Sequence, residues 1–504
     1  AIRHRAQDPR SPLFSACCGD TPLDAVAEGT FSRAPADIAR LGHAVAQAID
    51  AGDASSGDDA ATIARALASA ERPLVISGTG CGSAQVMEAA ARVADALCHS
   101  GRRAMLCLAL PEANSLGQAM LAGADSPTLD TLAERAAAGE LDTLVVLEND
   151  LYRRMPAAQA GQLLQDSGRV IVLDALDNHT TSAANLVRPA ASLAEGEGTR
   201  VSMEGRAQRP YPVFVPPLER RPRWTWLLDC RQGMALPAAA GLQHFDDITR
   251  ACAARVSALA GITGAAPDHH FRNAGVKIPR QPHRYSGRTA MRADISVHEP
   301  QQPSDEETPL AFSMEGLNRN QPGALLPYVW SPGWNSNQSL HRFQAEVGGP
   351  LRGGSAGMRL LASGTGPGPA AVEAPPPFAA QSGQWLLLAR HRIFGSEELS
   401  ALSPGIDELV EPGYLEICPQ DAALLEVADG DGLSIGADTL EVRVNTSMPA
   451  GCVGYAVGHS GTANLQAGQS VTLARADSWQ RRRPQLIGSD AGAYPDTSAG
   501  GAHD

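Results

Sequence analysis

Short apolar runs alternate with helical patterns from residue 73 to about residue 191. The apolar runs are too short for helices and are bounded by turn residues, so they predict strands at 73–77, 104–110, 143–147 and 169–174. Between them, apolar residues recur at helical spacing over 84–98, 128–139 and 157–164. This alternation is typical of stacked βαβ units. The sequence therefore predicts an α/β domain with one parallel sheet of at least four strands.

A second helical pattern precedes this domain. Apolar positions over 37–50 predict an amphipathic helix, and the polar stretch 51–59 predicts a linker. We expect a helical piece with its linker over 1–59 and the α/β domain over 60–215. The chain begins with alanine, where a complete reading frame would begin with methionine, so we expect it to be part of a longer protein.

The periodic pattern breaks down between residue 206 and about residue 377, where proline clusters recur. Because a long irregular stretch usually wraps another surface, we predict a proline- and arginine-rich docking region over 216–380. Short strand patterns separated by turns then return and predict a small β-barrel domain over 381–475, although a sandwich fits the same pattern. One helical turn over 419–425 interrupts them. The last residues, 476–504, predict a flexible tail.

Length and charge restrict the class of protein. A chain of 504 residues is long enough for two or three domains with buried cores. Its formal net charge of -14 argues against a general nucleic-acid or anionic-membrane binder, which needs a positive face. No apolar run reaches the roughly 18 residues of a membrane span, and the N-terminus has no apolar signal core.

The docking region contains an unusual separation of charge. Residues 272–292 hold six basic residues and no acid, whereas residues 294–307 hold five acids and no base. Two interpretations stay open, namely a docking surface and two solvated faces of opposite charge.

The nine cysteines show neither a Cys-x-x-Cys pair nor an even spacing, so we expect reduced thiols. Adjacent side chains diverge, and for that reason Cys17 and Cys18 alone are not expected to hold a metal. Cys81 is expected at a helix N-terminus, where a reactive thiol or a metal ligand is conceivable. The sequence offers no partner near it, which favours a small turn residue instead.

Two further motifs are weak candidates for chemistry. Gly78, Gly80, Gly82 and Ser83 form a glycine-rich turn between a strand and a helix, where backbone N–H groups cradle phosphates in nucleotide-binding proteins. Serine replaces the last glycine of that fingerprint. The histidine-rich run at 268–270, with His283 and His298 further on, matches no zinc spacing and predicts exposed loop histidines. We expect neither a catalytic nor a metal site, since the nucleophile-elbow, P-loop and zinc-protease motifs are missing from the sequence.

Seven sequence blocks in fixed order resemble a known family. They are LVISGTGCGSAQVMEAAARVADAL, LPEANSLG, TLVVLENDLYRR, RPAASLAEGEGTRVSMEGRAQR, PRQPHRYSGRTAMRADISVHEPQQPSDEETPLAFSMEG, WSPGWNSNQS and FQAEVGGPLR. All of them resemble the C-terminal half of the large iron-sulfur subunit (the G subunit) of bacterial NADH-quinone oxidoreductase. The likeness is densest from Arg280 to Gly316.

The resemblance implies a molybdopterin-oxidoreductase-like α/β region that lacks the pterin, followed by the small β-barrel. In that family, 2Fe-2S and 4Fe-4S clusters are held upstream of this region, and none of the nine cysteines matches their ligands. We therefore expect no cofactor in this segment and a structural and docking role in the translocating enzyme. The expected partners are other peripheral-arm subunits on the cytoplasmic side of the inner membrane, without nucleic acid or membrane insertion.

The resemblance also directs attention to the docking region. Bidentate arginine contacts and buried tryptophans dominate many interfaces, so we predict docking residues here: Arg280, His283, Arg284, Arg288, Arg292, Trp330 and Trp334. The other interpretation is that they hold the loop onto its own domain. Two alternative functions stay open: a molybdopterin-dependent oxidoreductase of the formate dehydrogenase type, and a free-standing dinucleotide-binding protein.

Overall fold

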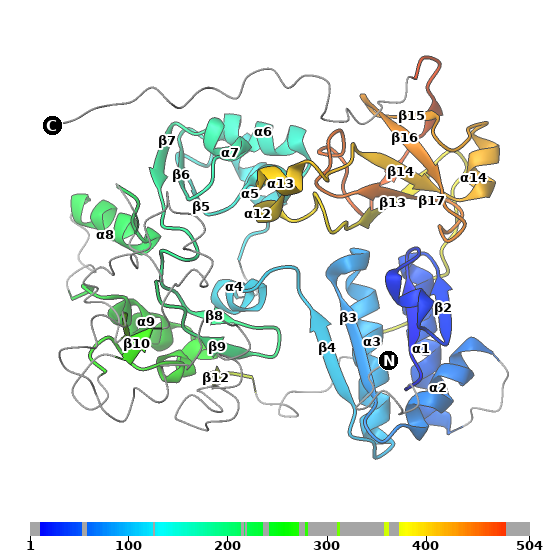
Figure 1. The fold of residues 1–504 in the computed structure, drawn as a ribbon, viewed down its shortest axis with the longest axis horizontal. Coiled ribbons are helices and arrows are strands. Elements are labelled where there is room, and N and C mark those ends of the chain that lie inside the picture. The colour runs from blue at the N-terminus through cyan, green and yellow to red at the C-terminus, as the bar shows by residue number, and fades with distance from the viewer. Residues whose placement is uncertain are drawn as a thin grey trace, which may run out of the picture. The chain divides into compact units, whose positions relative to one another are not determined.

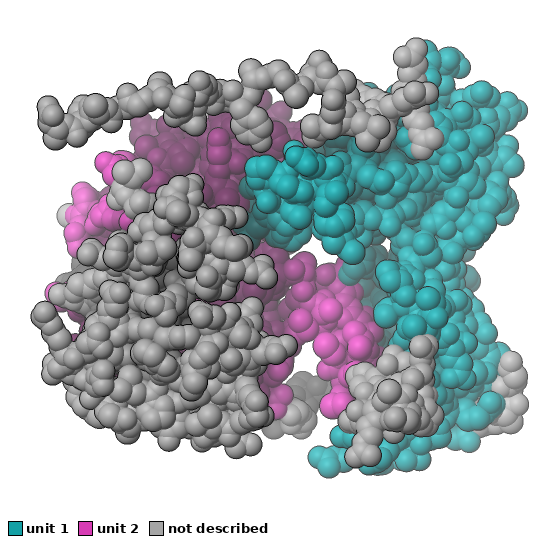
Figure 2. Space-filling view, in the orientation of Figure 1, with its two compact units in different colours: residues 1–73, 80–104, 372–504 teal, residues 74–79, 105–371 magenta. Residues whose placement is uncertain are grey.

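The chain divides into two compact units (Figure 2). Unit 1 comprises residues 1–73, 80–104 and 372–504, and unit 2 comprises 74–79 and 105–371. The computed structural model describes residues 11–52, 58–123, 126–212, 216, 219–234, 241–271, 278–280, 310–312, 357–361 and 372–479. Within these ranges, every helix is too short or too polar to span a membrane.

Unit 1 begins with a parallel strand pair and continues with helices. The elements are β1 (Phe14–Cys17), η1 (Pro22–Ala25), β2 (Gly29–Ser32), α1 (Pro35–Ala51), α2 (Asp59–Ser69) and α3 (Ala84–His99). The two predicted helices, α1 and α3, are confirmed. They pack closely because small residues meet at their contact: a Cβ atom on Gly42 would lie 2.9 Å from Cβ of Ala89.

Most of the core of unit 1 belongs to a curled seven-stranded sheet, seen at the upper right of Figure 1. Its order is β18-β13-β17-β14-β16-β15-β19, with parallel pairing of β13 with β17 and of β14 with β16. The strands are β13 (Trp385–Arg390), β14 (Tyr414–Ile417), β15 (Gly432–Ile435), β16 (Asp438–Val444), β17 (Cys452–Ala456), β18 (Ser470–Val471) and β19 (Ala474–Arg475). Leu387, Leu415, Leu433 and Val453 are fully buried in it.

The sheet only partly matches the predicted barrel. The strand patterns and the helical turn, α14 (Pro419–Leu424), form as expected, and two short helices, α12 (Glu398–Ala401) and α13 (Pro404–Asp407), lie between β13 and β14. The sheet order ends at β18 and β19, which describes a half-barrel. Trp479, at the start of the predicted tail, donates its Nε1–H to the carbonyl oxygen of Gly430 over 3.1 Å. The tail is therefore attached to the sheet at its first residues.

Unit 2 contains the predicted parallel strands, but in two sheets. β3 (Leu74–Gly78) pairs with β4 (Met105–Ala109), and a second sheet has the order β5-β6-β7. The latter consists of β5 (Leu144–Leu147), β6 (Val170–Asp174) and β7 (Leu186–Pro189). The predicted single sheet of at least four strands is thus wrong for the described residues. An apolar run indicates a strand, but it does not encode which other strand that segment pairs with.

Helices cover the three-stranded sheet as the periodic pattern predicts. α5 (Leu129–Ala137) and α6 (Ala157–Asp166) place Ala136 and Leu163 against Val146 and Val172 of the strands. Short helical segments follow the strands: α4 (Ser115–Ala122), η3 (Leu151–Arg153) and α7 (His179–Ser182). The α/β character of this region is therefore confirmed.

The region predicted to be irregular contains regular elements that the sequence pattern did not reveal. They are α8 (Arg223–Gly233), α9 (Phe245–Arg255), η5 (Ser257–Gly264), the parallel pair β10 (Ile278–Arg280) and β11 (Leu310–Phe312), and the strands β9 (Arg206–Gln208) and β12 (Met358–Arg359), which pair antiparallel with each other. β9 also pairs antiparallel with β8 (Arg200–Val201), which precedes this region. The prediction of an irregular segment was wrong at these places. α8 escapes notice because Trp226 lies opposite the face that Trp224, Leu227 and Leu228 share, and because polar residues fill most of the rest of the helix.

Candidate functional site

The backbone conformation and packing of the glycine-rich turn account for two of its glycines. A Cβ atom on Gly78 would lie 2.3 Å from the carbonyl oxygen of Ala109 on β4, so the parallel pairing requires glycine there. Gly82 has a φ of +62°, which also favours glycine, whereas a Cβ atom on Gly80 would meet nothing within 4 Å. The turn contains the 3-10 helix η2 (Thr79–Cys81), and Ser83 caps α3 without a side-chain hydrogen bond. The expectation that Gly78, Gly80, Gly82 and Ser83, the weak candidates for cofactor binding, hold no cofactor stays a prediction.

Cys81 has a partner that sequence reasoning missed. Cys18 lies more than sixty residues earlier, yet it belongs to the apolar cluster against which Cys81 packs. The thiol hydrogen bond from Cys18 lowers the pKa of Cys81 to about 7 and raises the pKa of Cys18 itself. In the sequence, only the tandem cysteines at positions 17 and 18 pointed to this neighbourhood. The strand β1, which ends at Cys17, had no recognisable pattern.

A charged network holds the loop that carries Cys18. Arg390 on β13 donates Nε–H to Oε2 of Glu416 over 3.0 Å, and its Nη2 donates to the backbone oxygen and Oδ1 of Asp20, each over 3.0 Å. Glu416 is buried and also pairs with Arg392. Asn445 donates to Oδ1 of Asp20 over 2.7 Å. These bonds fix the segment after β1 against strands β13 and β14 of the seven-stranded sheet.

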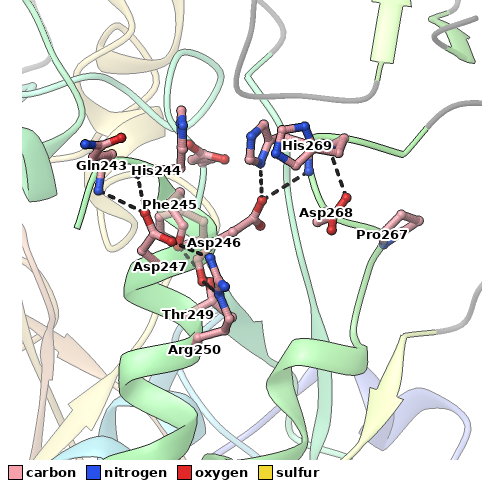
Figure 3. Close-up of polar contacts among 12 residues, drawn as sticks. Gln243, His244, Phe245, Asp246, Asp247, Thr249, Arg250, Pro267, Asp268 and His269 are labelled. Atoms are coloured by element: carbon pink, nitrogen blue, oxygen red, sulfur yellow. Dashed lines mark hydrogen bonds and ion pairs between the residues drawn. The ribbon is translucent and has the colours of Figure 1, made fainter. Parts of the chain in front are cut away.

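One histidine of the run 268–270 lies in a buried polar cluster of unit 2 (Figure 3), whereas Asp268 and His270 are exposed. His269 is only 7% exposed, so the prediction of exposed loop histidines is wrong for this residue. Asp246, in the first turn of α9, accepts a hydrogen bond from the backbone N–H of His269 over 3.1 Å and contacts its Nδ1 at 2.5 Å. Sequence spacing does not reveal this contact, because Asp246 belongs to a helix that was not predicted.

Arg209 provides the opposite charge in this cluster. Its guanidinium pairs with Asp246 and donates to Oε2 of Glu197 over 2.8 Å, and all three side chains are nearly buried. Burial opposes ionisation of Asp246, yet hydrogen bonds from His269 and Arg209 hold the pKa of this carboxyl below its usual value. The guanidinium also lies over the rings of Tyr211 and Phe245. The cluster is thus a structural ion network joining α9 to two loops.

Three imidazole rings pack beside this network at tilted angles. The ring of His269 lies 4.4 Å from that of His244 and 3.8 Å from that of His270, measured between centroids. A search of the described residues finds no group of three or more His, Cys, Asp and Glu side chains placed to hold a metal ion. His283 and His298 lie outside the residues that the structure describes.

Most predicted docking residues also lie outside the described ranges. Only the backbone of Arg280 is described, at the end of β10, where it pairs with Phe312 on β11. His283, Arg284, Arg288, Arg292, Trp330 and Trp334 are not covered, and neither are the acidic run and the basic run outside Ile278–Arg280. Their docking role stays a prediction.

Comparisons with known proteins address the family directly. The NADH-quinone oxidoreductase G subunit of Pseudomonas putida is 42% identical over 488 residues, which cover 94% of this chain and 54% of that protein. The corresponding G subunits of Salmonella typhimurium and Escherichia coli are 40% and 39% identical over 93% of this chain and 53% of their own lengths. The predicted resemblance to the G subunit of NADH-quinone oxidoreductase is confirmed. The chain spans about half the length of these relatives.

Two other similarities are more limited. A model of the molybdopterin oxidoreductase family matches residues 46–228, which confirms the predicted molybdopterin-oxidoreductase-like region. Acetylene hydratase from Pelobacter acetylenicus is a similar solved structure, with a TM-score of 0.48 and 12% identity over 91% of this chain and 68% of that chain. A likeness at that level supports no argument about function.

The molybdopterin family raises the question of whether this chain fits an anionic pterin dinucleotide. In parallel sheets, ligands bind beyond the carboxyl ends of the strands. Here β5 is followed by Glu148 and Asp150, and β6 ends at the buried Asp174. Three acidic side chains at one edge would repel phosphate groups, and Arg223 at that edge is already paired with Glu148. The residues at this edge do not fit such a cofactor.

The acidic side chains at this edge have hydrogen-bond or ion-pair partners within the chain. Asp150 accepts a hydrogen bond from Oγ1 of Thr180 over 2.8 Å, and Asp174 accepts one from Nδ2 of Asn178 over 3.0 Å. Glu148 has the unusual φ of +45°, and burial raises the pKa of its carboxyl despite the nearby arginine. These contacts connect β5 and β6 to α7 and α8, which is a structural arrangement.

Proposed function

We propose that this chain is the structural and docking part of the large iron-sulfur subunit of a proton-translocating NADH-quinone oxidoreductase. The observation that carries the proposal is the 39–42% identity to G subunits of that enzyme over 93–94% of the chain. Electron transfer from NADH to quinone would then use clusters of the 2Fe-2S and 4Fe-4S type elsewhere in the parent protein. This segment would support that path without catalysing a step itself.

Internal ion networks support a scaffold role. Arg209 joins α9 to the loop carrying Glu197, and Arg390 joins β13 to the loop carrying Asp20, with the acidic partners Asp246 and Glu416 nearly buried. Buried pairs of this kind fix segments that are distant in sequence, because breaking one leaves an uncompensated charge. A rigid support for a cluster-bearing region requires such fixed connections.

The proposal keeps the parts predicted from the sequence: 1–59 as helical piece and linker, 60–215 as α/β domain, 216–380 as docking region, 381–475 as β-barrel domain and 476–504 as tail. The partners would be other peripheral-arm subunits, on the cytoplasmic side of the bacterial inner membrane. Arginine forks and tryptophans of the docking region would contact them.

Charge reversal tests the docking residues. We expect the pair Arg284→Glu and Arg288→Glu to reduce co-purification of other complex subunits with the tagged chain, while its melting temperature is unchanged. The matched control is Arg102→Glu with Arg103→Glu, which alters two exposed arginines after α3. Intact assembly together with a lower melting temperature would show that the docking residues only hold their own loop.

A second candidate is a molybdopterin-dependent oxidoreductase of the formate dehydrogenase type. The family match over residues 46–228 favours it, whereas the acidic edge at Glu148, Asp150 and Asp174 opposes it. Elemental analysis for molybdenum or tungsten and the fluorescence of an oxidised pterin extract distinguish the two functions. One molybdenum or tungsten per chain would favour the second candidate.

A further inference from the structure

The segment between β13 and β14 exposes a concentration of large apolar side chains. We call residues 393–410 the α12–α13 lobe, after the two short helices that contact each other in it (Figure 1). Among the described residues of unit 1, five of the nine exposed large apolar side chains belong to this lobe, with exposed fractions between 39% and 83%. They are Ile393, Phe394, Leu399, Leu402 and Leu409. Single exposed apolar residues are common, but a group of this kind marks a surface that a partner covers.

The base of the lobe is fixed to the seven-stranded sheet at both ends. Where the lobe begins, the hydroxyl of Ser396 donates to the carbonyl oxygen of Val457, just after β17, over 2.7 Å. Where it ends, Nδ1 of His459 donates to the carbonyl oxygen of Glu411 over 2.8 Å. Glu397 caps the N-terminus of α12. The sheet therefore presents the apolar side chains in a defined arrangement, as a preformed docking surface requires.

The charges of the lobe restrict what can cover it. Residues 393–410 include four acidic residues and no basic one, and Asp407 and Glu408 are exposed beside Leu409. A second copy of this chain, bound through the same face, would bring these acids opposite one another, and the net charge of -14 adds to that repulsion. An anionic membrane surface would repel them as well. A protein surface with an apolar centre and a basic rim complements both features.

We propose that the α12–α13 lobe docks onto another subunit of the NADH-quinone oxidoreductase, at an apolar surface rimmed by arginine or lysine side chains. Leu399 and Leu402 are three positions apart, so they lie on one side of α12 and its C-cap, and they insert into the apolar centre. Asp407 and Glu408 contact the basic rim. This inference rests on the proposed function, and it adds a contact surface in unit 1 to the docking region predicted over 216–380.

Photo-crosslinking within the intact complex tests the partner directly. A tagged full-length chain carries the photoreactive benzoylphenylalanine in place of Leu402, and the complex is purified after illumination. Mass spectrometry then identifies the linked peptide. We expect a link to another subunit of the oxidoreductase, at a surface that includes arginine or lysine. The matched control carries the probe in place of Leu424, which is 69% exposed on α14 outside the lobe, and should not give that link.

Substitutions separate the apolar from the charged contribution. Leu399→Ser together with Leu402→Ser should lower co-purification of the linked subunit at least about tenfold, because apolar anchors carry much of the binding energy of an interface. Leu424→Ser is the matched control and should change it less than about twofold. Glu408→Arg should also lower co-purification, whereas Glu373→Arg, at an exposed acid of unit 1 outside the lobe, should not. The melting temperature of the chain should stay unchanged, because every altered side chain is exposed.

The outcomes distinguish this inference from the proposed function. A link from position 402 only to this chain or to a second copy of it, or no link at all, would overturn the proposal. Unchanged co-purification of the double serine variant would contradict the apolar contact, and unchanged co-purification of Glu408→Arg would contradict the basic rim. The proposed function stands in these cases if the unaltered chain still co-purifies with other subunits of the oxidoreductase. An unaltered chain that purifies without them would overturn the proposed function itself.

Discussion

The Nδ1 atom of His269 lies 2.5 Å from Oδ2 of Asp246, although the two residues are 23 positions apart and belong to different elements. The same carboxylate pairs with Arg209 through its other oxygen. Asp246 therefore joins the N-terminus of α9 to two loops. Substituting Asp246 should therefore destabilise unit 2 more than substituting an exposed acidic residue nearby.

Asp246→Asn should lower the free energy of unfolding by about 3 kcal/mol, because it leaves the buried Arg209 with one carboxylate fewer. Urea unfolding of the full chain measures the change. Asp268→Asn is the control, since Asp268 is exposed and should cost less than about 0.5 kcal/mol. Equal effects of the two substitutions would show that the Asp246 network contributes little.

The stability supplied by Asp246 should depend on pH. Its pKa is lower in the folded than in the unfolded chain, so its contribution is fully present above the unfolded value of roughly 3.9. That contribution is lost as the pH falls through the folded value, because protonation then favours unfolding. Unfolding free energies between about pH 6 and about pH 3 should converge for the unaltered chain and Asp246→Asn. Parallel curves would contradict the lowered pKa.

Glu416→Gln should destabilise unit 1 by about 3 kcal/mol, because Arg390 would keep its buried position without its main carboxylate partner. The matched control is Glu411→Gln, which breaks the ion pair with Arg443 at a largely exposed site. That control should cost less than about 1 kcal/mol. Thermal unfolding of both variants measures the difference, and a similar loss in each would argue against the Arg390 network.

Gly78→Ala and Gly80→Ala separate a structural from a ligand-binding origin of the glycine-rich turn. A Cβ atom on Gly78 would collide with the Ala109 carbonyl, so we expect a loss of about 2 kcal/mol or more. Gly80 has open space around it, and its substitution should change stability by less than about 0.5 kcal/mol. Isothermal titration with NADH should show no binding to either variant or to the unaltered chain. Saturable binding that Gly80→Ala removes would support a dinucleotide site.

Local patterns in the sequence predicted most regular elements, because the buried face of a helix or strand makes apolar residues recur at a regular spacing along the chain. α1, α3 and β6 were found this way, within two residues at each end. The spacing of apolar residues does not indicate which strands pair, and the division of the parallel strands into two sheets was therefore missed. α9 was missed for a different reason: its first turn contains Asp246 and Asp247, which serve a buried ion network and a helix cap rather than an apolar face.

The sequence predicted features of the candidate sites only where they depend on residues that are close together in the sequence. Cys81 was recognised as a thiol before a helix, but its neighbour Cys18 directly follows a strand of four residues with no clear pattern. His269 was expected to be exposed because no ligand spacing surrounds it, yet a distant carboxylate allows its burial. Contacts between remote segments decide both cases, and only the fold supplies them.

The central claim is that this chain is a docking scaffold within an NADH-quinone oxidoreductase. The most direct measurement is quantitative mass spectrometry of the complex that co-purifies with the tagged chain, combined with elemental analysis of the same sample. The account predicts other subunits of that oxidoreductase in fixed ratio to the chain, without stoichiometric molybdenum or tungsten. A chain that purifies without those subunits and carries one molybdenum per molecule would contradict it.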